Sequence, residues 1–304
     1  MTGAGLLAGL LAAASWGIGD FCGGFAARRV TTLTTVTASQ AVGLLLAIVA
    51  VLLSGEPAPG SASLLWAALA GLAGLAGVAC FYRALATGEM SLAAPLTAVI
   101  GAGVPAVVGL VAGDVLEPLQ LLGMACGLAA VAVVSRSAGS PAAEARSRQT
   151  ARSLPLILVA GLGFAAFFLA IGQATDLGGG AIWWPLLAAR AITVAVAVIV
   201  LAGLRAGPSG RSRPSALAGA RTPLLALVAT AGLPIGLAGL GDFGGNGFFL
   251  IAQGDGVFSL AVILSSLYPV TTVILAAGLL HERLTWMQLG GVALALVGVV
   301  LIAF

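Results

Sequence analysis

Residues 258–280, FSLAVILSSLYPVTTVILAAGLL, carry the strongest fold signal in this chain. The stretch contains no charged residue, and its polar side chains are limited to Ser, Thr and one Tyr. A helix needs about 20 predominantly apolar residues to cross the hydrocarbon core of a bilayer. We therefore predict that this segment is a transmembrane helix.

The rest of the sequence has the same character. Of 304 residues, 60% are hydrophobic and only 8% are charged, and the mean hydropathy is +1.15. Soluble domains are about 25% charged, so this composition excludes a water-exposed globule, and it excludes a disordered chain for the same reason. The apolar runs are continuous rather than alternating, which favours helices over a membrane barrel. Ten spans are predicted, at 4–26, 33–54, 63–86, 91–113, 118–135, 154–173, 181–204, 230–252, 258–280 and 285–304.

An internal repeat organises these spans. When the sequence is shifted by 168 residues, Ser91-Leu92-Ala93 falls on Ser259-Leu260-Ala261, and Gln120 falls on Gln288 without a gap. Each half then holds five spans, and an odd number inverts the second half in the membrane. The predicted fold is an all-α membrane protein with ten transmembrane helices, arranged as two inverted five-helix repeats around a central cavity. The repeats are residues 1–135 and 154–304, joined by an Arg-rich linker at 136–153.

The basic residues give a predicted orientation. All 13 are Arg, and eleven of them fall in the odd-numbered loops, whereas the even-numbered loops carry only acids. Positive residues mark cytoplasmic loops, so we expect a bacterial plasma-membrane protein with both termini outside. The 136–153 and 205–222 loops are expected to be flexible cytoplasmic connectors rather than nucleic-acid-binding arms.

The end of each half carries a family resemblance. The second half has Ser265-Ser266-Leu267-Tyr268-Pro269-Val270-Thr271-Thr272, then Glu282-Arg283-Leu284-Thr285, Gln288 and Gly291, and the first half has a degenerate version from Ala94 to Gly123. With Ser15-Trp16-Gly17 near the start, the chain resembles an EamA-type member of the drug/metabolite transporter superfamily. The resemblance implies a ten-helix bundle around a cavity and movement of a small metabolite, often outward. It does not imply which metabolite.

Three charged residues lie deep within predicted spans. Arg190 and Asp242 are near the middle of theirs, and Asp20 is nearer the cytoplasmic end. A charge at that depth is costly unless it is paired or faces water. Two readings stay open: a structural Arg–Asp bridge between helices, or a substrate or proton site. Asp20 and Asp242 also share a local Gly-Asp-Phe sequence, and the neighbouring glycines would allow close helix approach.

Six further polar or aromatic residues are secondary candidates for the cavity, although ordinary helix packing explains each of them equally well. Tyr268 is the strongest, because Pro269 follows it and interrupts the helical hydrogen bonding. The candidates are Trp16, Gln40, Tyr82, Asn246, Ser265 and Tyr268.

The predicted function is a secondary transporter, an exporter by its resemblance, that moves a small metabolite by alternating access. Proton coupling through the two aspartates is a further hypothesis. No GxxxxGK[ST] motif for ATP is present. The alternatives are an intramembrane enzyme and a small-molecule receptor or assembly protein. We expect no catalytic residues, no cofactor and no metal, since the single His and three scattered Cys form no ligand pattern. The expected partners are the small molecule and the lipid bilayer, without nucleic acid, and a Gly-rich helix surface would also permit a homodimer.

Overall fold

The structure is a computed structural model that describes residues 2–87, 90–134, 141–206, 224–254, 257–279 and 286–303. Within these residues every regular element is an α-helix, which confirms the predicted all-α class. The helices are α1 (Gly3–Arg29), α2 (Thr32–Ser54), α3 (Ser61–Thr87), α4 (Met90–Ala112), α5 (Pro118–Val134), α6 (Pro141–Leu177), α7 (Trp183–Ala206), α8 (Leu224–Gly254), α9 (Phe258–Ser265), α10 (Tyr268–Leu279) and α11 (Trp286–Ala303).

The helices match the predicted spans unevenly. Among the described residues, six helices are long and apolar enough to cross a membrane, and they cover the first, second, third, sixth, seventh and eighth predicted spans. The fourth, fifth and ninth spans fall on shorter apolar stretches. The chain is therefore a multi-pass membrane protein, while the count of ten spans stays a prediction.

Two helices differ from the predicted boundaries. The ninth span is divided into α9 and α10 at Ser266 and Leu267, so the interruption lies just before Tyr268 rather than after it. Helix α6 begins at Pro141, which makes most of the predicted 136–153 connector helical. Pro155 lies inside α6. Residues 136–140 of that connector, residues 207–222 of the other Arg-rich loop and the Glu282-Arg283-Leu284-Thr285 motif lie outside the described residues.

The starts and ends of the first two helices follow from local chemistry. The side chain of Thr2 accepts a hydrogen bond from the Gly5 amide at the start of α1, and Thr31 does the same for the Thr34 amide in α2. These caps satisfy amides that have no partner within the helix. Helix α2 ends at Gly55, whose φ of 67° is a left-handed conformation that glycine adopts without strain.

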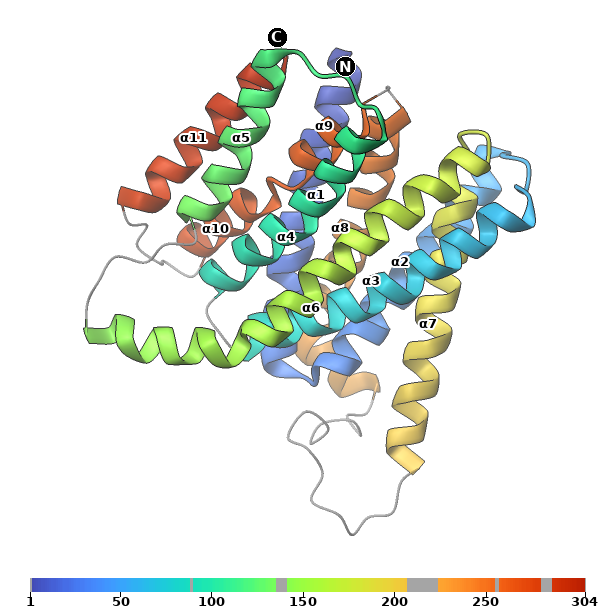
Figure 1. Ribbon diagram of the computed structural model, residues 1–304. Coiled ribbons are helices and arrows are strands. Elements are labelled where there is room, and N and C mark those ends of the chain that lie inside the picture. The colour runs from blue at the N-terminus through green and yellow to red at the C-terminus, as the bar shows by residue number, and fades with distance from the viewer. Residues whose placement is uncertain are drawn as a thin grey trace.

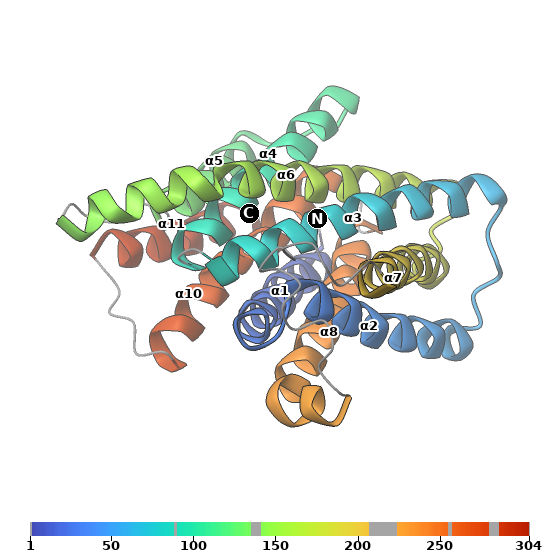
Figure 2. The ribbon, with the colours of Figure 1, turned by 90° about the horizontal axis from the view of Figure 1, so that it is seen from below.

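The helices interlock across the two parts of the chain. Helix α1 packs most extensively on α8, and α3 packs most extensively on α6, while α2 contacts α7 and α5 contacts α11. Figures 1 and 2 show α3 beside α6 and α5 beside α11. Helix α1 starts and α11 finishes at the upper end of Figure 1, and the Arg-bearing end of α1 lies at the opposite end.

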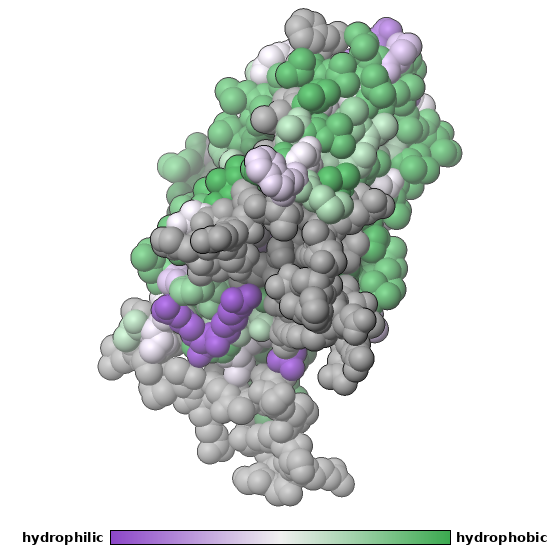
Figure 3. All heavy atoms as spheres, turned by 90° about the vertical axis from the view of Figure 1, so that its left-hand side faces the viewer, coloured by the Kyte–Doolittle hydropathy of each residue, from purple (hydrophilic) through white to green (hydrophobic). Residues whose placement is uncertain are grey.

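The outer surface is apolar, as a lipid-facing surface must be. Large hydrophobic side chains on α2 remain exposed, among them Leu45, Leu52 and Leu53. On the face in Figure 3, hydrophobic side chains dominate the upper part, and the most hydrophilic described residues gather mainly toward the lower part. Such extensive apolar exposure is unusual for a soluble monomer and agrees with burial in a bilayer.

Candidate functional site

The site is built where α1 crosses α8. A Cβ added to Gly241 would lie 2.5 Å from the Ser15 carbonyl oxygen and 2.8 Å from the Gly19 Cα, so the two helix backbones are in direct contact there. Gly245 likewise leaves room for the Trp16 ring. Small residues allow this close approach. As a result the two Gly-Asp sequences, Gly19-Asp20 and Gly241-Asp242, lie against each other although they are far apart in the chain.

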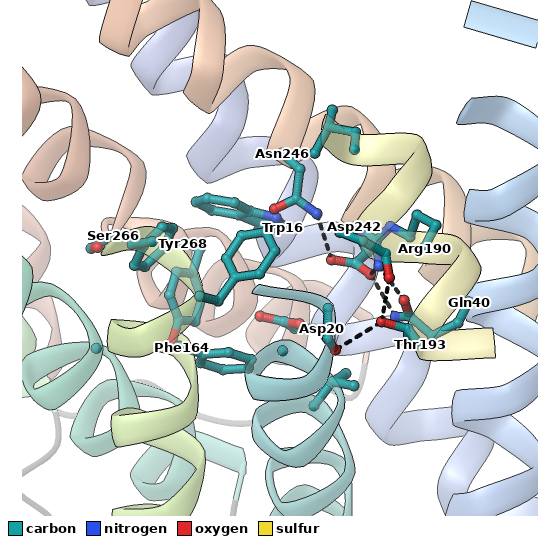
Figure 4. A pocket seen from close by; sticks show the side chains of 18 of the residues that line it. Trp16, Asp20, Gln40, Phe164, Arg190, Thr193, Asp242, Asn246, Ser266 and Tyr268 are labelled. Atoms are coloured by element: carbon teal, nitrogen blue, oxygen red, sulfur yellow. Dashed lines mark hydrogen bonds and ion pairs between the residues drawn. The ribbon is translucent and has the colours of Figure 1, made fainter. Parts of the chain in front are cut away.

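Arg190 on α7 pairs with Asp242 on α8. The Arg190 Nη1 atom lies 2.7 Å from Asp242 Oδ2, and the arginine side chain is only 8% exposed. Gln40 on α2 joins them, because its Nε2 donates to Asp242 Oδ2 at 2.7 Å and its Oε1 accepts from Arg190 Nη1. Asn246, one turn after Asp242, donates to Oδ1 at 3.3 Å. Asp242 therefore receives hydrogen bonds from three side chains on three helices (Figure 4).

This cluster lines one end of a cavity. The opposite end is marked by Ser266 and the middle by aromatic side chains. Trp16 and Tyr268 meet edge to face, with ring centroids 6.5 Å apart, and Trp16 also packs 5.5 Å from Phe168. The cavity thus combines a wall of aromatic rings with a charged end, a combination typical of small-molecule sites.

Asp20 lines the same cavity but has no such partners. Figure 4 places it between the Arg190–Asp242 cluster and the rings of Tyr268 and Phe164. Within the described residues, no hydrogen bond or ion pair reaches its carboxylate, whereas Asp242 next to it is fully engaged. The two carboxylates repel each other when both are ionised. One carboxylate of the site is therefore neutralised by protein groups and the other is not.

Seven of the predicted site residues line this cavity: Trp16, Asp20, Gln40, Arg190, Asp242, Asn246 and Tyr268. Two do not. Tyr82 is 1% exposed and its ring fills the space left by Gly23, so it packs against α1. Ser265 is fully buried in the last turn of α9, and its neighbour Ser266 lines the cavity instead.

The structure adds lining residues that the sequence did not single out. Phe164, Phe167 and Phe168 on α6 supply much of the aromatic wall, and Thr193 lies one turn beyond Arg190. The Thr193 hydroxyl bonds the Gly71 carbonyl at 2.8 Å, which ties α7 to α3. Gly71, Gly74 and Gly101 also line the cavity, and the missing side chain of Gly71 lets α3 approach the Ala189 carbonyl of α7. The spacing of Gly71 and Gly74 on one face of α3 was the only sequence signal for these lining residues. Gly is too common in this chain for that spacing to be informative.

Several buried polar atoms at the site lack a partner in the described part of the chain. They include Arg190 Nη2 and the Tyr268 hydroxyl, and both residues line the cavity. A buried polar atom without a partner is costly, and these two atoms have almost no surface exposed to the cavity. No group of three or more His, Cys, Asp and Glu that could hold a metal ion occurs among the described residues.

Comparison with known proteins decides the family. The model of the EamA-like transporter family matches residues 3–136 and again residues 152–304. The chain belongs to the EamA-like transporter family. The resemblance at the ends of the two halves is thereby confirmed, and a transporter role for this EamA protein follows from its family.

Two further comparisons add the fold and nothing more specific. A solved structure described only as a crystal structure of a protein has a TM-score of 0.63 and 18% sequence identity, covering 99% of this chain and 96% of the other. At that identity the likeness shows the fold alone. No curated protein matches the EamA chain.

Proposed function

We propose that this EamA protein is a secondary transporter that moves a small metabolite out of a bacterial cell by alternating access, coupled to protons. The observation that carries the proposal is the cavity lined by one neutralised carboxylate, Asp242, and one unneutralised carboxylate, Asp20. Exchange of protons for substrate requires a carboxylate that can bind either one of the two.

The pairing of helices supports two repeats of opposite orientation, residues 1–135 and 154–304. The first helix of one repeat, α1, pairs with the third of the other, α8, and the reciprocal pair is α3 with α6. A two-fold relation between the repeats produces reciprocal pairs of this kind. Transporters with inverted repeats carry their site at the interface between the repeats, where the Arg190–Asp242 pair and Asp20 lie.

The break between α9 and α10 supports a moving element. Residues 266 and 267 interrupt the helix directly beside the cavity, and Ser266 and Tyr268 line it. The Ser266 hydroxyl has no partner among the described residues. Interrupted helices in transporters place backbone groups at the substrate and provide points of bending.

The orientation follows from the Arg distribution. Arg28 and Arg29 lie in the last turn of α1, at the end of the bundle from which α7 also continues toward the Arg-rich 205–222 segment. Under the positive-inside rule this end faces the cytoplasm.

Counterflow in proteoliposomes tests the proposal. Vesicles containing the purified protein are loaded with an unlabelled metabolite extract, and entry of compounds from a labelled extract is followed by mass spectrometry. Exchange that depends on the protein supports transport. Chemical conversion of a compound would instead indicate an intramembrane enzyme, and saturable binding without exchange would indicate a receptor; either result overturns the proposal. Glu117→Gln is the control variant, because Glu117 is an exposed residue of the α4–α5 connection and does not line the cavity.

A further inference from the structure

The charges that line the cavity do not cancel. Arg190 carries one positive charge, and Asp20 and Asp242 carry two negative charges when both are ionised. The Arg190–Asp242 pair, at 2.7 Å and with the support of Gln40 and Asn246, is internally neutral. The uncompensated charge is therefore the carboxylate of Asp20. In an environment of low dielectric, such a charge requires a proton or a cation.

The surroundings of Asp20 favour an organic cation over a metal ion. Trp16 precedes Asp20 by one helical turn, so both side chains lie on the same face of α1. Tyr268 and Phe164 stand beside them in Figure 4. Aromatic faces attract ammonium groups by cation–π interaction, whereas a metal ion would need several oxygen ligands that the rings do not supply. The rings also offer an apolar wall for the body of the molecule.

From these contacts we propose that the cavity binds a small organic monocation: an amine on an aromatic or aliphatic body. Its ammonium group lies at Asp20 and its apolar body lies against Trp16, Tyr268 and Phe168. This inference rests on the proposed transport function and specifies its substrate class.

Charge balance favours an organic cation over a zwitterion or an anion as the ligand. A monocation brings the cavity to neutrality, a zwitterion leaves one uncompensated negative charge, and an anion adds a second. An anionic metabolite would also have to displace Asp242 from Arg190, which would leave that aspartate unpaired. The amine is therefore the favoured ligand of the three.

Binding should depend on pH, because a proton competes with the amine for Asp20. The charged and titratable groups around Asp20 are Asp242 on α8, Arg190 on α7, Tyr82 on α3, Tyr268 on α10 and Cys22 on α1 itself. Asp242 is already held by three donors, and the tyrosines and the cysteine are neutral in the physiological range. Acidification should thus weaken amine binding chiefly through Asp20.

Three probes of matched shape test the inference: 2-phenylethylamine as the cation, phenylalanine as the zwitterion and 3-phenylpropionate as the anion. Their affinities for the detergent-purified protein are measured by calorimetry, with quenching of tryptophan fluorescence as a second readout. We expect the amine to bind most tightly. Asp20→Asn should weaken amine binding about 10- to 100-fold, as expected for loss of a hydrogen bond to a charged group, and Glu117→Gln should leave binding unchanged.

The outcomes separate the inference from the proposed transport function. Tighter binding of the zwitterion or the anion, absence of amine binding, or an affinity unchanged in Asp20→Asn would overturn the inference. An Asn side chain is close in size to Asp, and the unfolding temperature of the variant shows whether it remains folded. If Asp20→Asn does not fold, Trp16→Leu provides the second test. We expect this variant to bind the amine about threefold more weakly or worse, because the cation–π contact is missing. Amine binding without exchange in vesicles would support the inference and contradict transport.

Discussion

Asp242 accepts a hydrogen bond from Arg190 at 2.7 Å, while Asp20, which lies on the other side of the same helix crossing, has no hydrogen-bond or ion-pair partner in the described part of the chain. Both aspartates follow a glycine at the point of closest contact between α1 and α8. Two carboxylates with similar sequence surroundings therefore have different electrostatic roles. Asp242 is paired with Arg190 between α8 and α7, and under the proposed function Asp20 is the carboxylate that meets the ligand.

The Arg190–Asp242 pair should contribute strongly to stability. Removing one partner of a buried pair leaves an uncompensated charge and typically costs on the order of 3–5 kcal/mol. We expect about 3 kcal/mol for Arg190→Gln, since the Asp242 side chain is 23% exposed. The variant Arg190→Gln/Asp242→Asn, which removes both charges, should recover much of this loss. Fluorescence-detected unfolding in detergent measures both effects, and wild-type stability of Arg190→Gln would show that the pair is not structural.

The α1–α8 crossing should not tolerate a methyl group at Gly241. The added Cβ would lie 2.5 Å from the Ser15 carbonyl oxygen, which belongs to a rigid helix backbone. Gly241→Ala should therefore separate the helices and lower the free energy of unfolding by about 1–3 kcal/mol, the usual range for overpacking. Gly236→Ala on the same helix is the matched control, because nothing lies within 4 Å of its added Cβ. Equal unfolding temperatures for the two variants would contradict this packing.

Asp114 should couple the α4–α5 connection to α9. Its Oδ2 accepts from the Ser259 amide at 2.8 Å and from the Ser259 hydroxyl, and thereby caps a helix whose own N-cap residue, Val257, makes no side-chain cap hydrogen bond. Loss of a helix cap costs about 0.5–2 kcal/mol, so Asp114→Ala should destabilise the protein by that amount. A double-mutant cycle with Ser259→Ala should give a non-zero coupling energy. Glu117→Ala in the same connection serves as the control, and strict additivity of Asp114→Ala and Ser259→Ala would contradict the contact.

Much of the fold could be predicted because the bilayer imposes simple rules. Span length and the absence of charge located the long helices, and the 168-residue repeat indicated related halves. The interruption at Ser266 and Leu267 was displaced from the position that Pro269 suggested, because proline disturbs the turn that precedes it. The helical start of α6 at Pro141 was missed, since an Arg- and Ala-rich segment outside the membrane has no apolar period to reveal it.

The site was predictable only where a residue was costly to bury. Arg190, Asp20 and Asp242 stood out because a charge within a span demands a partner or a ligand. Phe164, Phe167 and Phe168 gave no such signal, because an aromatic residue in a membrane helix can lie in the core or face lipid without a penalty. Tyr82 was a secondary candidate for the cavity, but its ring occupies the space that a side chain at Gly23 would fill, so it packs against α1. From the sequence, the acids Glu56 and Asp114 only marked one side of the membrane. In the structure each also caps the start of a helix in the other half of the chain. Glu56 accepts from the Ile182 and Trp183 amides, and Asp114 accepts from the Ser259 amide.

The most direct test of exchange at Asp20 is the number of protons released when the ligand binds. Purified protein in weakly buffered detergent solution is titrated with N,N,N-trimethyl-2-phenylethanaminium, a permanent cation that carries no proton of its own, and a pH-indicator dye reports the release. At a pH where Asp20 is protonated in the free protein, we predict close to one proton released per bound cation, none for Asp20→Asn and an unchanged value for Glu117→Gln. Binding of the cation without proton release at any pH, or proton release that persists in Asp20→Asn, would contradict the account.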